Sequence, residues 1–133
     1  MATTRDGGRV VYKAGADLSA KQYYIVKRGT TAGECVLSDS GADVHLGVLQ
    51  NAPKENDTAD ILGRHASDTG KVIAGGVLTP GAALTSDANG KAVVTTTEDD
   101  QVIGYYAGNA NAAAGDIVEF TPSDNVVAPA LAS

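Results

Sequence analysis

Aromatic residues are scarce in this chain of 133 residues: there is no tryptophan, Phe120 is the one phenylalanine, and aromatics make up 5% of the sequence. Hydrophobic residues still make up 43%, so the core must be built mainly from Val, Ile, Leu and Ala. No run approaches the roughly 18 continuous apolar residues of a membrane span, and the first residues lack the apolar stretch of a signal peptide. We therefore expect a soluble protein made in a cytoplasm, with no membrane partner.

Chemically reactive residues are equally few. Cys35 is the single cysteine, and His45 and His65 are the two histidines, which excludes a disulfide framework and the paired-cysteine spacing of a zinc site. An isolated cysteine in an apolar run is usually a small buried hydrophobe. His45 alternates with its apolar neighbours in a strand-like run and is expected at a surface or interface. We predict no catalytic residue, no metal ligand and no cofactor.

The acidic and glycine-rich turns do not change this prediction. Residues 38–43 and 86–91 lack the twelve-residue loop ending in Glu that binds calcium, and Asp39 and Asp87 are expected to accept hydrogen bonds from their own turns. Residues 64–72 lack the spacing of a phosphate-binding loop. The acidic run 97–100 is expected to be a solvated turn, and weak cation binding there is left open.

The net charge of −6 is unevenly distributed. Residues 1–28 hold six Lys and Arg residues against two acids, a balance of +4, while residues 29–133 hold four basic against fourteen acidic residues, a balance of −10. The basic segment is expected to contact an acidic surface, on a partner, on its own body or on a neighbouring copy. Nucleic acid is not expected as a partner, because the acidic body repels phosphate and basic–aromatic interleaving is missing.

Apolar residues recur with a period of two in short runs, which predicts strands. Val, Ile, Thr and Tyr dominate these runs and turn-forming clusters separate them. About ten short strands at this spacing predict an all-β fold, a small barrel or a sandwich. The expected strands are 9–14, 22–28, 34–38, 45–50, 58–64, 70–75, 82–86, 91–96, 101–107 and 116–121.

These strands predict a single β domain over residues 10–121. A flexible basic arm is expected at residues 1–9 and an irregular tail at residues 122–133, because chain termini stay ordered only where contacts hold them. Asn89-Gly90 is a strong signal for a two-residue hairpin and should join the strands at 82–86 and 91–96.

Two stretches, LGVLQNAP at 46–53 and IGYYAGNA at 103–110, repeat one pattern. Each follows a strand and a Ser-Asp turn and precedes a polar turn and another strand, which predicts a loose internal duplication. Gly47 and Gly104 hold the same place in the two stretches. Because glycine costs about 0.5–1 kcal/mol relative to alanine inside a strand, both are predicted to have a structural role at a bulge, a barrel corner or a close backbone contact.

Four stretches occur in a characteristic order: ADLSAKQYYIVK, VLSDSGADVHLGVLQNAP, KVIAGGVLTPGAALTSDANGKAV and VIGYYAGNANAAAGDIVEF. Together they resemble the capsid decoration, or cement, proteins of tailed bacteriophages. The resemblance covers about residues 16–120 and leaves the basic start outside it.

This resemblance implies a small non-enzymatic β protein on the outer capsid surface of a virion, synthesised in the host cytoplasm. Such a protein binds the expanded capsid and cements neighbouring major capsid proteins. Members of this family are commonly homotrimers at local threefold positions, and dimeric versions exist. The implied partners are therefore the major capsid protein and further copies of this chain.

The expected contact residues for the capsid or a sister subunit come from two places. Arg5, Arg9 and Lys13 lie in the basic segment, and Tyr105 and Tyr106 replace two aliphatic residues of the first copy of the repeat. An alternative reading is a carbohydrate- or receptor-binding module that uses paired tyrosines as its platform. An enzyme on a small barrel is the weakest reading, since no acid, base or metal set is present.

Overall fold

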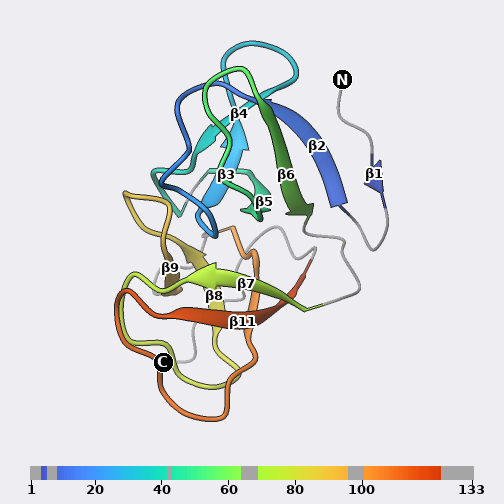
Figure 1. Ribbon diagram of the computed structural model, residues 1–133. Coiled ribbons are helices and arrows are strands. Elements are labelled where there is room, and N and C mark those ends of the chain that lie inside the picture. The colour runs from blue at the N-terminus through green and yellow to red at the C-terminus, as the bar shows by residue number, and fades with distance from the viewer. Residues whose placement is uncertain (1–3, 6–8, 42, 64–68, 96–100, 124–133) are drawn as a thin grey trace.

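The computed structural model (Figure 1) describes residues 4–5, 9–41, 43–63, 69–95 and 101–123. The fold is all-β, as predicted, and every expected strand is present. No helix among the described residues is long and apolar enough to cross a membrane. The strands are β1 (Thr4–Arg5), β2 (Arg9–Ala14), β3 (Ile25–Arg28), β4 (Glu34–Leu37), β5 (His45–Leu49), β6 (Thr58–Gly63), β7 (Gly70–Ile73), β8 (Ala83–Ser86), β9 (Ala92–Val94), β10 (Gly104–Tyr106) and β11 (Ile117–Pro122).

Strands β2 to β6 form a closed barrel. The order around the barrel is β2-β4-β3-β5-β6, and β6 returns to pair antiparallel with β2. The β2–β4 pair is parallel, with Ala14 opposite Cys35. The short β1 lies antiparallel to the start of β2, within the segment expected to be an arm. The interior is filled by buried residues: Ala14, Leu18, Val26, Cys35, Leu49, Ala59 and Ile61.

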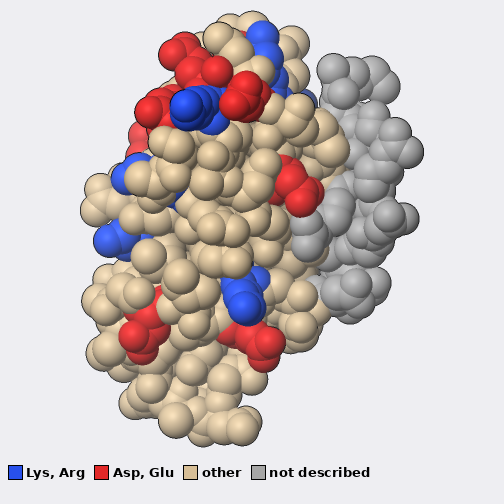
Figure 2. Space-filling model, viewed as in Figure 1, with Lys and Arg blue, Asp and Glu red and all other residues tan. Residues whose placement is uncertain are grey.

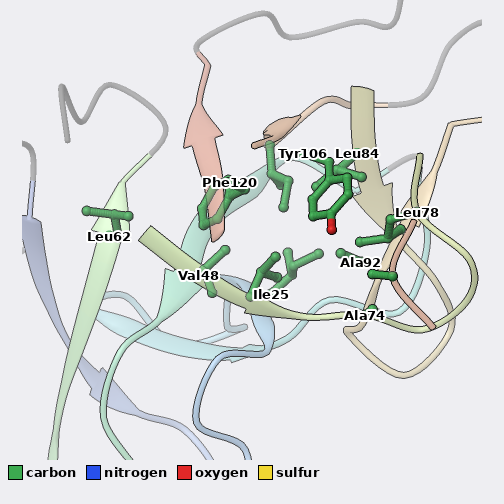
Figure 3. Close-up of a cluster of buried hydrophobic side chains, with 12 residues drawn as sticks. Ile25, Val48, Leu62, Ala74, Leu78, Leu84, Ala92, Tyr106 and Phe120 are labelled. Atoms are coloured by element: carbon green, nitrogen blue, oxygen red, sulfur yellow. The ribbon is translucent and has the colours of Figure 1, made fainter. Parts of the chain in front are cut away.

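The remaining strands form a second sheet in the order β7-β11-β10-β8-β9. Its edge strands approach each other, because one parallel bridge joins Ala74 to Ala92 and the N–H of Gly75 donates to the carbonyl oxygen of Ala92 (2.7 Å). This sheet therefore curls toward a second closed ring around its own core. Figure 3 shows that core, in which the rings of Tyr106 and Phe120 lie among aliphatic side chains.

The two sheets are two copies of one unit, so the predicted duplication is confirmed. We call residues 9–63 the first unit and residues 70–122 the second unit. Each unit has the same strand order, with β2 to β6 matching β7 to β11. Backbone hydrogen bonds recur as well: Ala14 N–H donates to Asp57 (2.9 Å) as Ala74 N–H donates to Asp116 (2.8 Å).

The predicted alignment of the two copies was wrong at the Ser-Asp turns. Ser38-Asp39 follows β4, whereas Ser86 ends β8 and Asp87 follows it, and β8 matches β3 rather than β4. The same dipeptide occurs at both places because Ser and Asp suit many tight turns. The hairpin prediction is confirmed, since residues 87–91 join β8 directly to β9.

Gly47 and Gly104 occupy matching places in β5 and β10. Their φ angles are +153° and +157°, which glycine adopts most readily. A Cβ atom on Gly47 would overlap the carbonyl oxygen of Leu62, and one on Gly104 would overlap that of Thr121. In both units, therefore, the neighbouring strand packs its backbone against a glycine.

The first unit docks into the seam between β7 and β9 of the second. Tyr23 has φ +73°, so the expected strand 22–28 begins only at Ile25. The carbonyl oxygen of Tyr23 accepts a hydrogen bond from Ile73 N–H (2.9 Å), and Ile25 N–H donates to Gly90 (2.7 Å). Three side chains of the first unit, Ile25, Val48 and Leu62, join the core of the second (Figure 3).

Candidate functional site

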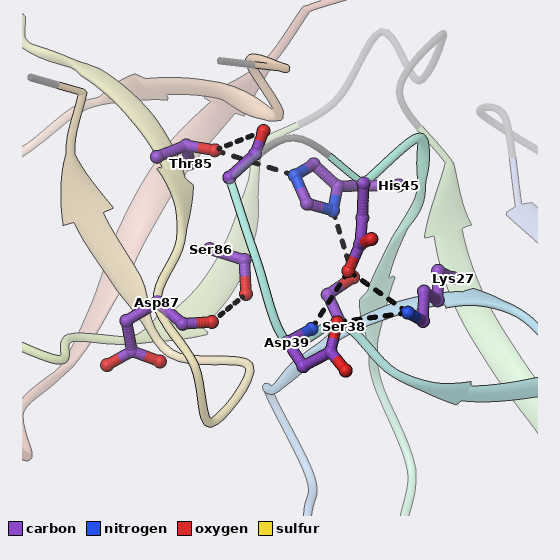
Figure 4. A network of polar contacts seen from close by, with 9 residues as sticks. Lys27, Ser38, Asp39, His45, Thr85, Ser86 and Asp87 are labelled. Carbon is purple, nitrogen blue, oxygen red and sulfur yellow. Dashed lines mark hydrogen bonds and ion pairs between the residues drawn. The ribbon is translucent and has the colours of Figure 1, made fainter. Parts of the chain in front are cut away.

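A buried polar cluster links the two units around His45 (Figure 4). The Oγ of Ser38 lies 2.9 Å from His45 Nδ1, and the Oγ1 of Thr85 lies 3.5 Å from Nε2. Thr85 also donates to the carbonyl oxygen of Gln101 (2.8 Å). His45 and Ser38 come from the first unit and Thr85 from the second, so this cluster is a polar link across the contact between the units.

Of the two positions expected for His45, a surface or an interface, the exposed surface is wrong, because the residue is 3% exposed at the contact between the two units. His45 and Val48, three residues apart, both point out of the first barrel because the β3–β5 register shifts between them, and the second unit covers that face. Ser38 and Thr85 are also buried. A hydroxyl beside an imidazole is the arrangement of a catalytic pair, but a substrate cannot reach these buried atoms, and we assign the cluster a structural role.

An ion-pair cluster lies beside this link, at the turn that contains Asp39. Lys27 Nζ lies 3.0 Å from Asp39 Oδ1 and 3.2 Å from Asp43 Oδ2. The hydrogen bond to Asp39 is the main cause that raises the pKa of Lys27. Burial alone would raise the pKa of Asp43, but hydrogen bonds from Asp39 N–H and Lys27 outweigh it and lower that pKa. Among the described residues of this turn, Asp43 Oδ2 accepts a hydrogen bond from Asp39 N–H (3.0 Å); residue 42 lies outside the described residues, so the prediction for Asp39 stays a prediction.

The second acidic turn forms as predicted. Asp87 Oδ1 accepts hydrogen bonds from the N–H groups of Asn89 (2.8 Å) and Lys91 (2.9 Å). Among the described residues, no group of three or more His, Cys, Asp or Glu side chains could hold a metal ion. His65 and the acidic run 97–100 lie outside the described residues.

Cys35 is buried in the first barrel, as expected for an isolated cysteine. Burial raises the pKa of its thiol to about 11. The thiol is therefore protonated at neutral pH, and its role is to fill the core.

The basic contact residues lie on β1 and β2. Arg5 is in β1 and Arg9 begins β2, and the two residues are paired in the antiparallel register of those strands. The side chain of Lys13 is 51% exposed and its Nζ lies 3.6 Å from Glu34 Oε2. The structure thus brings the backbone of the three predicted basic residues onto one pair of strands.

The tyrosine pair divides between core and surface. Tyr106 is 7% exposed, and its hydroxyl donates to the carbonyl oxygen of Ala110 (2.7 Å). Tyr105 is partly exposed, opposite Ala83 on β8 and Thr121 on β11. Of the two tyrosines proposed as contact residues, Tyr105 is the one whose side chain reaches the surface.

The two units present equivalent ends that differ in charge, a feature that the sequence pattern did not reveal. The first end consists of residues 16–24 and 50–56, and the second of residues 76–82 and 107–115. The same hydrogen bond joins the two loops of each end, from Leu18 N–H to Pro53 (2.9 Å) and from Leu78 N–H to Ala112 (3.2 Å). We call these surfaces the charged end and the uncharged end.

The charged end carries four ionisable acidic or basic side chains, and the uncharged end carries none. In Figure 2 the lowest part of the view, which the loops after β7 and before β11 reach, shows no Lys, Arg, Asp or Glu; acidic residues lie just above it, and more charged residues gather at the top. Val77 is 63% exposed, and Ile117, beside the uncharged end, is 54% exposed. The charged residues of the other end are Asp17, Lys21, Lys54 and Glu55.

No protein-family model matches this chain, and no curated protein sequence matches it. Among solved structures it is similar to the head fiber gp8.5 N base in bacteriophage phi29, a crystal structure. The TM-score is 0.67 at 19% sequence identity, and the match covers 95% of this chain and 98% of that chain. The likeness therefore concerns the fold, over nearly the whole of both chains.

Proposed function

We propose that this protein is a non-enzymatic structural component of a phage virion, which binds the outer surface of the capsid and cements neighbouring major capsid proteins. The observation that carries the proposal is the fold, which over 95% of the chain resembles the base of a phage head fiber. The resemblance of the sequence to capsid decoration proteins points to the same location. The partners in this proposal are the major capsid protein and further copies of the chain, in a homotrimer or a dimer.

The arrangement of the chain fits a role in binding rather than in chemistry. The polar cluster at His45 is sealed, and the thiol of Cys35 is buried. Two covalently linked units packed through a shared core form a stiff body that can hold contacts at a distance from each other. The basic residues Arg5, Arg9 and Lys13 supply a contact for an acidic capsid surface, which the net charge of −10 in residues 29–133 would otherwise repel.

The test is co-sedimentation of the purified chain with expanded capsids that carry no surface proteins. The capsids should be assembled from the major capsid protein of the genome that encodes this chain. We expect saturable binding at a fixed ratio to the capsid subunits, and raised resistance of the capsids to heat. A chain that stays in the supernatant at every concentration would contradict the proposal, and binding to a glycan array would then favour the carbohydrate-binding alternative.

The contribution of the arm is tested in the same assay with a chain that lacks residues 1–8. This deletion leaves β2 and its pairing with β6 in place. We expect weaker binding that depends less on salt, because fewer charge pairs are screened. Lys54→Ala, which removes an exposed positive charge outside the arm, is the control and should bind like the unaltered chain. Undiminished binding of the shortened chain would show that the arm does not contribute to capsid binding.

A further inference from the structure

We propose that the uncharged end of the second unit is the surface that meets the capsid shell, and that it docks on an uncharged, apolar patch of the assembled major capsid protein. This inference rests on the proposed function and specifies which surface carries it. The evidence is an internal comparison, because the chain contains the same backbone unit twice.

Equivalent positions of the two ends carry different residues. Asp17 and Val77 each precede the leucine that bonds the opposite loop, and Thr58 and Ile117 each begin the last strand of their unit. In the loops before those strands, Lys54 and Glu55 of the first unit correspond to Ala113 and Ala114 of the second. At these four positions the second unit has apolar residues where the first has charged or polar ones: Val77, Ala113, Ala114 and Ile117.

Folding does not require these apolar residues. The first unit forms the same loops, with the same connecting hydrogen bonds, while it carries charged and polar side chains at the corresponding places. Val77 and Ile117 are also mostly exposed, so they contribute little to the core. Single exposed apolar residues such as Val44 are normal on a protein surface, but several of them gathered at one end, where the fold does not need them, are what a surface covered by a partner would carry.

Desolvation explains why the second end and not the first would be covered. Burying an ion removes its hydration, at a large free-energy cost unless a partner charge replaces it. The charged end would have to desolvate four such groups. At the uncharged end the one carboxylate at the margin, that of Asp116, already accepts a hydrogen bond from Ala113 N–H (2.9 Å). In Figure 1 the loop between β5 and β6 of the charged end lies at the top and the loops of the uncharged end lie at the bottom, so covering the second end leaves that loop in water.

The size of the uncharged end argues against a free dimer as its occupant. It exposes eleven residues, about half of the roughly 20–30 residues that each side of a standard stable interface contributes. A contact of this size lasts when other contacts add to it. The capsid shell supplies such contacts, because the basic arm and neighbouring bound copies also hold the protein there.

The experiment exchanges residues between the ends. The variant Val77→Asp with Ile117→Thr gives the uncharged end the first unit's own residues, and the reverse exchange, Asp17→Val with Thr58→Ile, is the matched control. Both variants are compared with the unaltered chain by co-sedimentation with expanded capsids, and by analytical ultracentrifugation without capsids. Far-ultraviolet circular dichroism and thermal unfolding verify that each variant keeps the fold, which we expect because all four positions are exposed. The control also loses the hydrogen bond from Ser19 N–H to Asp17 (3.1 Å), so a small loss of thermal stability is expected for it.

We expect the capsid affinity of the first variant to fall at least tenfold and that of the control to stay within twofold. If the first variant binds as the unaltered chain does, or if the control loses affinity instead, the uncharged end is not the docking surface. If the first variant changes the sedimentation of the free protein from an oligomer to a monomer, the surface is covered by a second copy, and the assignment to the shell is wrong. Failure of the unaltered chain to bind capsids would contradict the proposed function itself, which separates the two outcomes.

Discussion

Gly47 and Gly104 show at the scale of single residues how backbone packing selects glycine. Their place in the sequence repeat indicated a structural need, and the structure shows its cause, which is the carbonyl oxygen of a neighbouring strand. The strand pairing that places this oxygen beside Gly47 joins residues about fifteen positions apart in the sequence. The sequence alone therefore indicated that glycine is needed at these two positions, but it did not identify the carbonyl oxygen that excludes a side chain.

We predict that Gly104→Ala lowers the free energy of unfolding by roughly 2–4 kcal/mol, because a positive φ disfavours a side chain and the Cβ would displace the backbone of β11. Gly81 is the matched control: its φ is +79° and nothing lies within 4 Å of an added Cβ. Gly81→Ala should cost only about 1 kcal/mol. Urea denaturation of both variants measures the difference, and equal losses would show that backbone overlap is not the cause.

Cys35 gives a prediction on pH. Burial raises the pKa of the thiol from an ordinary value of 9.0 to about 11, so the folded state favours the protonated form. The resulting stability is complete below pH 9 and is lost as the pH rises toward 11. At pH 10.5 the loss should be about 2 kcal/mol by linkage.

Urea denaturation at pH 8 and pH 10.5 measures this loss, with Cys35→Ala as the reference for all other titrating groups. The unaltered chain should lose more stability than the variant over this interval. In the folded protein at pH 8 the thiol should also resist Ellman's reagent. Identical pH dependence in the two proteins, or rapid labelling of the folded chain, would contradict the burial of the thiol.

At the scale of elements, periodicity and turn chemistry predicted most of the fold. All ten expected strands form, and the Asn89-Gly90 hairpin lies where expected. The start of β3 was predicted three residues early, because Tyr23 has a positive φ, which is not expected of a tyrosine. The matching residue of the second unit is Gly81, with φ +79°. Comparison of the two units therefore indicates a positive φ at this position, which the tyrosine of the first unit does not suggest.

The β8–β9 hairpin depends on the carboxylate of Asp87, which accepts two backbone N–H groups. We predict that Asp87→Ala destabilises the protein by about 1–3 kcal/mol, the range for lost hydrogen bonds to a charged acceptor. Asp87→Asn keeps an acceptor oxygen in the same place and should recover part of the loss. Thermal unfolding of both variants tests this; equal destabilisation by Ala and Asn would mean that the negative charge, rather than the acceptor geometry, holds the turn.

At the scale of the whole molecule, the two units share one core. Leu62 of the first unit is 3% exposed and lies against Gly70 and Phe120 of the second unit. The link between His45 and Thr85 crosses the same contact. Two units that share buried side chains in this way should unfold together.

We predict that Leu62→Ala lowers the free energy of unfolding by roughly 2–4 kcal/mol, as for other buried leucines, and does so for both units at once. Urea denaturation followed by tyrosine fluorescence and by far-ultraviolet circular dichroism should give coincident transitions in the unaltered chain. Separate transitions for the two probes would show that the units are independent domains. Val11→Ala, at a more exposed position of β2, is the control and should cost much less.

The candidate surfaces also depend on this scale. The unequal charge of the chain was visible in its composition, and the basic residues were predicted from it. The contrast between the charged and uncharged ends was not, because the two loops of each end lie more than twenty residues apart in sequence. Only the equivalence of the two folded units makes Asp17 comparable with Val77.

The sequence by itself determined the strands, the turns between them and the repetition of one unit, because side-chain alternation and turn preference act over a few neighbouring residues. The tertiary structure decided what covers the outer face of each strand. His45, Ile25, Val48 and Leu62 all point out of the first barrel, yet they are buried, since the second unit docks there. Alternation assigns a residue to one of two faces, and only the packing of distant segments determines whether that face meets water or protein.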